Sequence, residues 1–250
     1  MPRGVRGLVV AAMAGTLVAA CGESGARTTA TTTTAAGVGT AGARTVPARR
    51  AARHGPIPHA LRTAESAAED TIDLALAGKR ARVVAKANAL KAVAHGPAGA
   101  ALQAAGVSGS RIAEFRARAD EVARLAPDAD LLRVALASNR AFALMPEFFA
   151  RYDSPIPAAV TALDHADFEA KLQAEAGAAA ALRAAVADLD RTWIELRPDV
   201  VRSGGARVAA RFDAHVARMR RLASAGGRAA AREAQHGLDL VDEIEAVYDR

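Results

Sequence analysis

The sequence has a single cysteine and few aromatic residues. With Cys21 as its only thiol, the chain cannot form an intramolecular disulfide, so a folded domain must rest on its hydrophobic core. A chain of 250 residues is long enough to build one. Hydrophobic residues make up 51% of the chain but aromatic residues only 4%, so Ala, Leu and Val supply most of the apolar surface. Because Ala and Leu favour helices while strands favour β-branched and aromatic residues, the composition predicts an all-α protein.

The predicted folded part carries no excess of either charge. Residues 1–58 contain seven arginines and one acid, Glu23, which leaves 26 basic and 26 acidic residues in 59–250. A nucleic-acid-binding domain concentrates its basic excess on the domain itself. The formal net charge of +6 therefore belongs to the N-terminal segment, and we expect no nucleic-acid partner.

Patterns that carry common catalytic chemistry are missing. The chain has no His-x-x-x-His, no His-Glu-x-x-His and no pair of cysteines, and it lacks phosphate-loop and dinucleotide-binding patterns. The segment Gly106-Val107-Ser108-Gly109-Ser110 departs from a nucleophile elbow at its last position. We therefore expect no enzyme and no cofactor.

The first twenty residues have the order of a secretory signal peptide. Arg3 and Arg6 precede an uncharged run over residues 7–20. The run is shorter than the roughly 20 residues that a membrane-spanning helix needs. Residues 1–20 are thus predicted to be a signal peptide.

The end of this run, Leu17-Val18-Ala19-Ala20-Cys21, resembles the lipobox of bacterial lipoproteins. The resemblance implies cleavage before Cys21, a thioether-linked lipid on its sulfur, and acylation of the new amine, for example by palmitate. Two or three acyl chains give stable anchoring, so we expect a membrane-anchored envelope lipoprotein facing the periplasm or the exterior. Gly22 implies sorting to the outer membrane in a host that has one. The alternative is an ordinary signal peptide with a chance cysteine.

Residues 21–57 are predicted to be the lipidated cysteine followed by a disordered linker. Thr, Ala, Gly and Arg dominate from Glu23 to about Gly55, including four consecutive threonines at 31–34. Such a segment has almost no apolar surface to bury, so burial would not offset the conformational entropy lost on ordering.

Apolar residues recur at helical spacing beyond Pro58. The clearest stripes are Leu182, Val186, Leu189, Trp193, Leu196, Val200 and Val208, Phe212, His215, Met219, Leu222. Others are Ile112, Phe115, Ala119, Val122, Leu125 and Leu238, Val241, Ile244, Tyr248. Glycines and prolines, Gly78 and Gly177 among them, fall between or within the stripes as turns or interruptions, and Asp128 and Ser203 are candidate N-caps.

The two halves of the helical region align with each other. At a shift of 99 residues, Ala77-Gly78 falls on Ala176-Gly177, and at a shift of 97 Phe115 falls on Phe212. This alignment predicts two tandem four-helix repeats, residues 58–152 and 157–250, joined by a Pro-rich loop. They would form either two bundles or one larger mixed bundle.

Four polar residues on or near apolar faces are candidate ligand-binding groups. His215 interrupts an apolar stripe, and His236 could face the same interior. Asn139 and Gln235 occupy equivalent positions in the repeat alignment. Each has a structural alternative, because a buried polar side chain must be hydrogen-bonded whatever its role.

Acidic residues offer a second candidate site. Asp242 and Glu245 are three residues apart, which places both carboxylates on one helix face, as metal binding requires. A solvated face is the alternative. Asp164-His165-x-Asp167 is interpreted as a solvated helix start, because His165 points away from the two acids.

The outline of an anchored tandem bundle is loosely similar to the imelysin-like iron-uptake proteins. Their His-x-x-Glu metal motif has no match among the six histidines, so that function is not implied here. Our first hypothesis is a non-enzymatic module that binds an envelope protein partner or acts as a scaffold. The second is a metal- or small-ligand-binding bundle.

Overall fold

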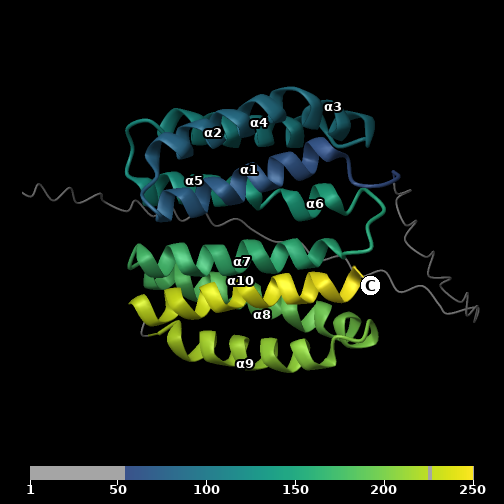
Figure 1. The fold of residues 1–250 in the computed structure, drawn as a ribbon, viewed down its shortest axis with the longest axis vertical. Coiled ribbons are helices and arrows are strands. Elements are labelled where there is room, and N and C mark those ends of the chain that lie inside the picture. Colours follow the sequence, from purple (N-terminus) through teal and green to yellow (C-terminus); the bar gives the residue numbers. More distant parts are fainter. Residues whose placement is uncertain (1–53, 225–226, 250) are drawn as a thin grey trace, which may run out of the picture. The chain divides into compact units, whose positions relative to one another are not determined.

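The described part of the chain, residues 54–224 and 227–249 of a computed structural model, is all-α, which confirms the predicted fold class. Its helices are α1 (His59–Leu76), α2 (Arg80–His95), α3 (Pro97–Ala104), α4 (Gly109–Leu125), α5 (Leu131–Phe142), α6 (Met145–Phe149), α7 (Ala158–Glu175), α8 (Ala179–Arg202), α9 (Ala206–Leu222) and α10 (Gly227–Tyr248). Figure 1 shows them as two groups, α1–α6 and α7–α10. The predicted signal peptide, Cys21 and most of the predicted linker lie outside the described residues.

Glycines end the first helix of each group. Gly78 follows α1 with φ 71° and Gly177 follows α7 with φ 68°, and both belong to turns between antiparallel neighbours. Only glycine adopts this left-handed conformation without strain. The predicted N-caps are wrong: Asp130, not Asp128, caps α5 by accepting the N–H groups of Leu132 and Arg133, and Ser203 follows the end of α8.

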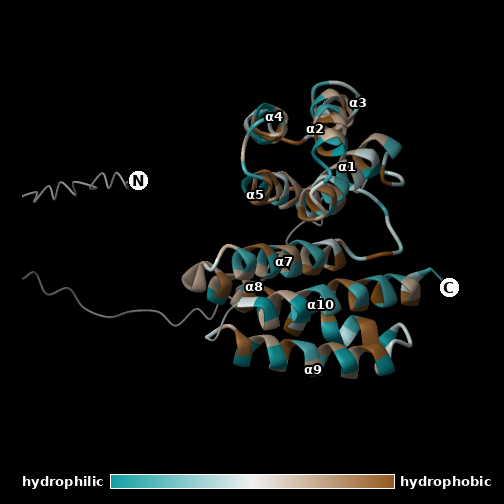
Figure 2. Ribbon diagram, turned by 60° about the vertical axis from the view of Figure 1, so that its left-hand side comes forward, coloured by the Kyte–Doolittle hydropathy of each residue, from teal (hydrophilic) through white to brown (hydrophobic). Residues whose placement is uncertain are grey.

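The apolar stripes pack into two cores. The first core unites α1–α6 around buried phenylalanines such as Phe115, Phe142 and Phe148. The second lies among α7–α10 and contains the stripe that ends at Val200, around Trp193 and Phe212. Figure 2 shows hydrophobic and hydrophilic residues alternating along the helices, as expected for amphipathic helices that bury one face.

Helix α7 joins the two cores. Val160, Leu163 and Ala170 belong to the second core, while Phe168 and Leu172 belong to the first. It packs against α8 and α10 within its own group and against α5 and α6 of the other. Because α7 lies between the groups, polar residues on it can meet side chains from both.

Residues 54–57, which were predicted to belong to the disordered linker, pack against the helical unit. The His54 and Asp153 backbone N–H groups donate to the Arg151 and Gly55 carbonyls, and Ile57 is buried in the first core. These contacts hold the entry to α1 against the loop that leads to α7.

The predicted duplication stays a prediction. The second group consists of four long helices, whereas the first adds the short helices α3 and α6. Gly96-Pro97 separates α2 from α3, while Pro198 lies inside the unbroken α8. None of the described helices is both long enough and apolar enough to cross a membrane.

Candidate acidic groove

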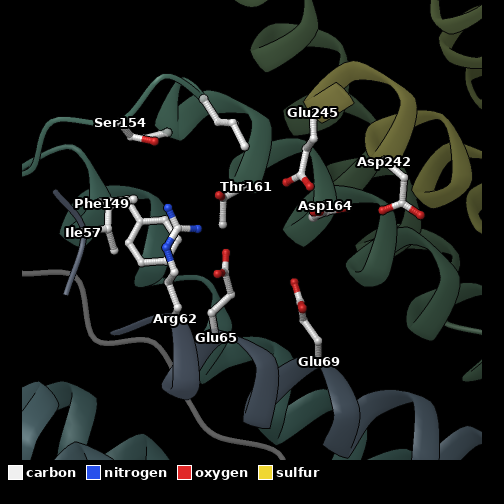
Figure 3. A pocket seen from close by; sticks show the side chains of 12 residues that line it. Ile57, Arg62, Glu65, Glu69, Phe149, Ser154, Thr161, Asp164, Asp242 and Glu245 are labelled. Carbon is white, nitrogen blue, oxygen red and sulfur yellow. The ribbon is translucent and has the colours of Figure 1, made fainter. Parts of the chain in front are cut away.

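Carboxylates from three helices face one groove. Glu65 and Glu69 extend from α1 toward Asp164 on α7 and Glu245 on α10, with Asp242 beside them (Figure 3). Asp73 and Asp239 continue the lining further along α1 and α10. We call these seven residues, Glu65, Glu69, Asp73, Asp164, Asp239, Asp242 and Glu245, the acidic groove.

The α1 carboxylates share a face because of their spacing. Glu65, Glu69 and Asp73 follow one another at intervals of four residues, so they form a row along the helix. Buried residues of the same helix, including Leu61, Ala64, Ala68 and Ile72, fix its rotation against the first core. The row therefore lies at the edge of the buried face, where α1 borders α10.

The predicted pair Asp242 and Glu245 belongs to this groove. Both line the same cavity, as their spacing of three residues on α10 predicted. Glu245 is half-buried, whereas Asp242 is exposed, so the solvated-face alternative still describes Asp242. The buried Val241 and Ile244 between and beside them hold α10 against the second core.

The groove has two adjoining cavities. The first, of about 170 Å³, also includes Ile57, Phe149 and the hydroxyl-bearing Thr161. The second, of about 190 Å³, includes Phe168 and Leu238. Glu69, Asp164 and Asp242 line both cavities and therefore mark the centre of the groove.

Most groove carboxylates have no partner within the described residues. Asp239 accepts a hydrogen bond from Gln235 Nε2 at 3.1 Å. Within residues 54–224 and 227–249, the side chains of the other six form no hydrogen bond or ion pair. Asp164 is the deepest of them, half-buried on α7 at the floor of both cavities. Solvent still reaches its carboxylate oxygens, which are not among the buried unpartnered atoms, so a donor or a cation beside them would be favourable without being required.

The lack of partners is reflected in the pKa values. Burial, then the charge of Glu245, raises the pKa of Glu65 to about 7, although Arg62 opposes the shift. Burial, followed by the charges of Glu65, Glu245 and Asp73, raises the pKa of Glu69 to about 8. Burial and the charge of Glu69 raise the pKa of Asp164 well above 3.8. Near neutral pH the groove therefore holds protons in place of cations.

Among the residues that the structure describes, cationic side chains lie near the two ends of the groove. Arg62 lines the first cavity and partly offsets the rise in the pKa values of Glu65 and Glu245 that burial causes. At the other end, Lys171 donates to Gln235 Oε1 at 2.5 Å and partly offsets the burial that raises the pKa of Asp73. The centre, formed by Glu69, Asp164 and Asp242, has only like charges acting on it.

A separate polar cluster is enclosed in the second core. His215 Nε2 lies 3.0 Å from Asp167 Oδ1, and His215 Nδ1 lies 3.1 Å from Glu233 Oε1. Arg218 donates to the other oxygen of Glu233 at 3.1 Å. Although burial lowers the pKa of His215, its bonds to Asp167 and Glu233 outweigh burial and raise it above 6.5. A protonated imidazole donates to both carboxylates, so this cluster is a neutralised charge network.

This cluster corrects one interpretation of the sequence. Asp167 is completely buried in the middle of α7, so the segment from Asp164 to Asp167 is not a solvated helix start. Asp164 and Asp167 are three residues apart on α7, and Asp164 lines the acidic groove whereas Asp167 lies in the core. His165 points elsewhere, as expected, and its Nδ1 lies 3.2 Å from Asn139 Oδ1.

The four predicted ligand-binding residues do not meet at one place. His215 is buried in the charge network, whereas His236 is exposed, with its ring centre 6.4 Å from that of His215. Asn139 is buried and donates to Glu169 Oε2 on α7 at 2.7 Å, which is the structural alternative foreseen for it. Gln235 is exposed at the edge of the second cavity.

A larger cavity, of about 350 Å³, lies among α4, α5, α7 and α8. Its charged groups already have partners: Arg118 and Arg140 pair with Glu114 and Glu121, and Glu169 accepts from Asn139. Because these charges are satisfied within the protein, the cavity has less need of an ionic ligand than the smaller groove has.

Sequence reasoning missed the α1 row and interpreted Asp164 as part of a solvated helix start. The row does leave a signal, because Glu65-x-x-x-Glu69-x-x-x-Asp73 runs alongside an apolar stripe at the same period. Its proximity to α10 depends on how the two helix groups pack. Among the described residues, no group of three or more His, Cys, Asp or Glu side chains converges closely enough to hold a metal ion as they stand.

Comparisons with known proteins identify no relatives. No protein-family model matches the chain, and neither the curated proteins nor the solved structures contain a significant match.

Proposed function

We propose that the helical unit binds a cation in the acidic groove and that lipidated Cys21 anchors the chain in the cell envelope. The observation that carries the binding proposal is Asp164, a carboxylate at the floor of both cavities to which none of the described residues donates a hydrogen bond or offers a cation. A bound cation would supply the missing counter-charge to Asp164, Glu69 and Asp242 together.

The groove favours the second sequence hypothesis, a ligand-binding bundle, over the first. Six unpartnered carboxylates in one groove raise one another's pKa values, so they destabilise the folded state when all are ionised. A ligand that neutralises these carboxylates would remove the repulsion and so explain why they lie together. The protein-interaction hypothesis stays a prediction, and the anchoring proposal rests on the lipobox alone.

Thermal unfolding of the full-length chain in detergent, with and without added cations, tests the binding proposal. A ligand that binds only the folded state raises the unfolding temperature in a concentration-dependent way. We expect this rise with Mg²⁺, Ca²⁺ or an organic diammonium at pH 8, and its loss in Asp164→Asn.

Glu195→Gln is the matched control, because Glu195 is an exposed carboxylate on α8 outside the groove. It should retain the wild-type rise. If none of these cations shifts the wild-type protein, or if Asp164→Asn shifts as much as the wild type, the groove does not bind cations.

A further inference from the structure

We infer that the ligand of the acidic groove is a linear organic polyammonium ion, a diamine or polyamine, rather than a metal ion. This inference rests on the proposed cation binding and names its ligand class. It comes from the shape of the groove, the kinds of side chain that line it, and the distribution of its unpartnered acids.

The groove is long relative to a metal site. Glu65 and Asp73 are eight residues apart on α1, so they are separated by about 12 Å along the helix axis. Metal ligands instead converge within about 2.6 Å of one point, and no such convergence occurs in the described residues. Carboxylates spaced along two adjoining cavities match charges spaced along a flexible chain.

The lining also favours ammonium groups over metals. It contains no histidine or cysteine, which disfavours borderline and soft metals; against Mg²⁺ and Ca²⁺, which prefer oxygen ligands, the argument is the lack of convergence. An ammonium group only donates hydrogen bonds, and the carboxylates of the groove and the hydroxyl of Thr161 accept them. Phe149 and Phe168 line one cavity each and supply apolar surface against which the methylene groups of such a ligand can pack.

The centre and the two ends have different parts in this arrangement. One ammonium group binds at Glu69, Asp164 and Asp242, which are common to both cavities and have no cation beside them within residues 54–224 and 227–249. The aliphatic chain then extends along one cavity or both. Further ammonium groups meet Glu65 and Glu245 at one end or Asp73 and Asp239 at the other.

Calorimetric titration of the detergent-solubilised full-length chain at pH 8 tests this assignment. The probes are butylamine, putrescine, spermidine and Mg²⁺, each tested separately. We expect one spermidine per chain, with affinity falling by roughly tenfold or more from spermidine to putrescine and again to butylamine, since each ammonium adds a charge-assisted interaction. Mg²⁺ should bind more weakly than putrescine although both carry two charges.

Variants separate the centre from the ends. Glu69→Gln should weaken all the amines, whereas Glu65→Gln and Asp73→Asn should weaken spermidine more than butylamine and so reduce the advantage of spermidine. Glu195→Gln should match the wild type. Tighter binding of Mg²⁺ than of putrescine, or equal binding of butylamine and spermidine, overturns the polyammonium assignment and leaves cation binding intact. Absence of binding by every probe overturns both.

Discussion

A Cβ atom placed on Gly237 of α10 would lie 2.3 Å from Oδ2 of Asp167 on α7. It would also lie 2.5 Å from His215 Nε2, so glycine at this position lets α10 pack directly over the buried charge network. Asp167 Oδ2 has no hydrogen-bond partner among the described residues. The network therefore depends on close helix packing as well as on its hydrogen bonds.

Gly237→Ala should destabilise the protein by about 1–3 kcal/mol, because the added methyl group forces apart α10 and the Asp167–His215 pair. Denaturant unfolding monitored by circular dichroism measures the change. Gly109→Ala is the control: Gly109 begins α4, and a Cβ there meets nothing within 4 Å. Unchanged stability in Gly237→Ala would show that α10 shifts without cost.

His215→Ala should cost about 3–5 kcal/mol, because it leaves the carboxylates of Asp167 and Glu233 enclosed without the imidazolium between them. Chemical denaturation at pH 6, below the raised pKa of His215, measures the loss. The double variant His215→Leu/Asp167→Leu should recover part of it by removing the unpaired carboxylate. A loss below about 1 kcal/mol for His215→Ala would mean that the network contributes little.

The sequence predicted the helices and their buried faces well, because amphipathic spacing is a local property. The stripe from Leu182 to Val200 is buried throughout, and the shared face of Asp242 and Glu245 follows from their spacing. The acidic groove could not be predicted in full, since α1 and α10 are far apart in the chain. Likewise, the bonds from His215 to Asp167 and Glu233 join three helices, and no local pattern records them.

Stability should fall as the pH rises from about 5 to about 8.5. The folded-state pKa values of Glu65 and Glu69, about 7 and about 8, exceed the ordinary value of 4.5. The folded state therefore binds more protons than the unfolded state across this range, and its advantage is lost as the pH passes the folded-state values. The charged groups that face these two acids are Arg62, which opposes the rise in pKa, and the carboxylates of Asp70, Asp73, Asp164, Asp242 and Glu245.

Glu69→Gln should flatten this dependence, since the amide resembles the protonated acid and cannot ionise. Thermal unfolding at pH 5 and pH 8.5 without added cations measures it. At pH 5 the variant should unfold at the same temperature as the wild type, and at pH 8.5 it should unfold several degrees above the wild type. In a chain of this size, a gain of about 1 kcal/mol in unfolding free energy raises the unfolding temperature by about 2–4 °C. Glu195→Gln should follow the wild type. Parallel curves for Glu69→Gln and the wild type would contradict the raised pKa of Glu69.

Cys21→Ala should abolish both lipidation and cleavage before residue 21, because no other residue of the chain supplies a thiol. Mass spectrometry of the mature N-terminus from a bacterial host is the measurement. A wild-type N-terminus that carries no lipid, at any residue from Ala20 to Gly25, would contradict the lipobox resemblance and indicate a secreted protein.

Proton release on binding tests the central claim, that unpartnered carboxylates in the groove exchange protons for a cation. The measurement is calorimetric titration of the full-length chain with spermidine at pH 7.5 in two buffers of different ionisation enthalpy. At that pH Glu65 and Glu69 together hold about one proton, so saturation should release about one proton per chain. Glu69→Gln should release less. Saturable binding whose heat is independent of the buffer, or no binding in either buffer, would contradict the account.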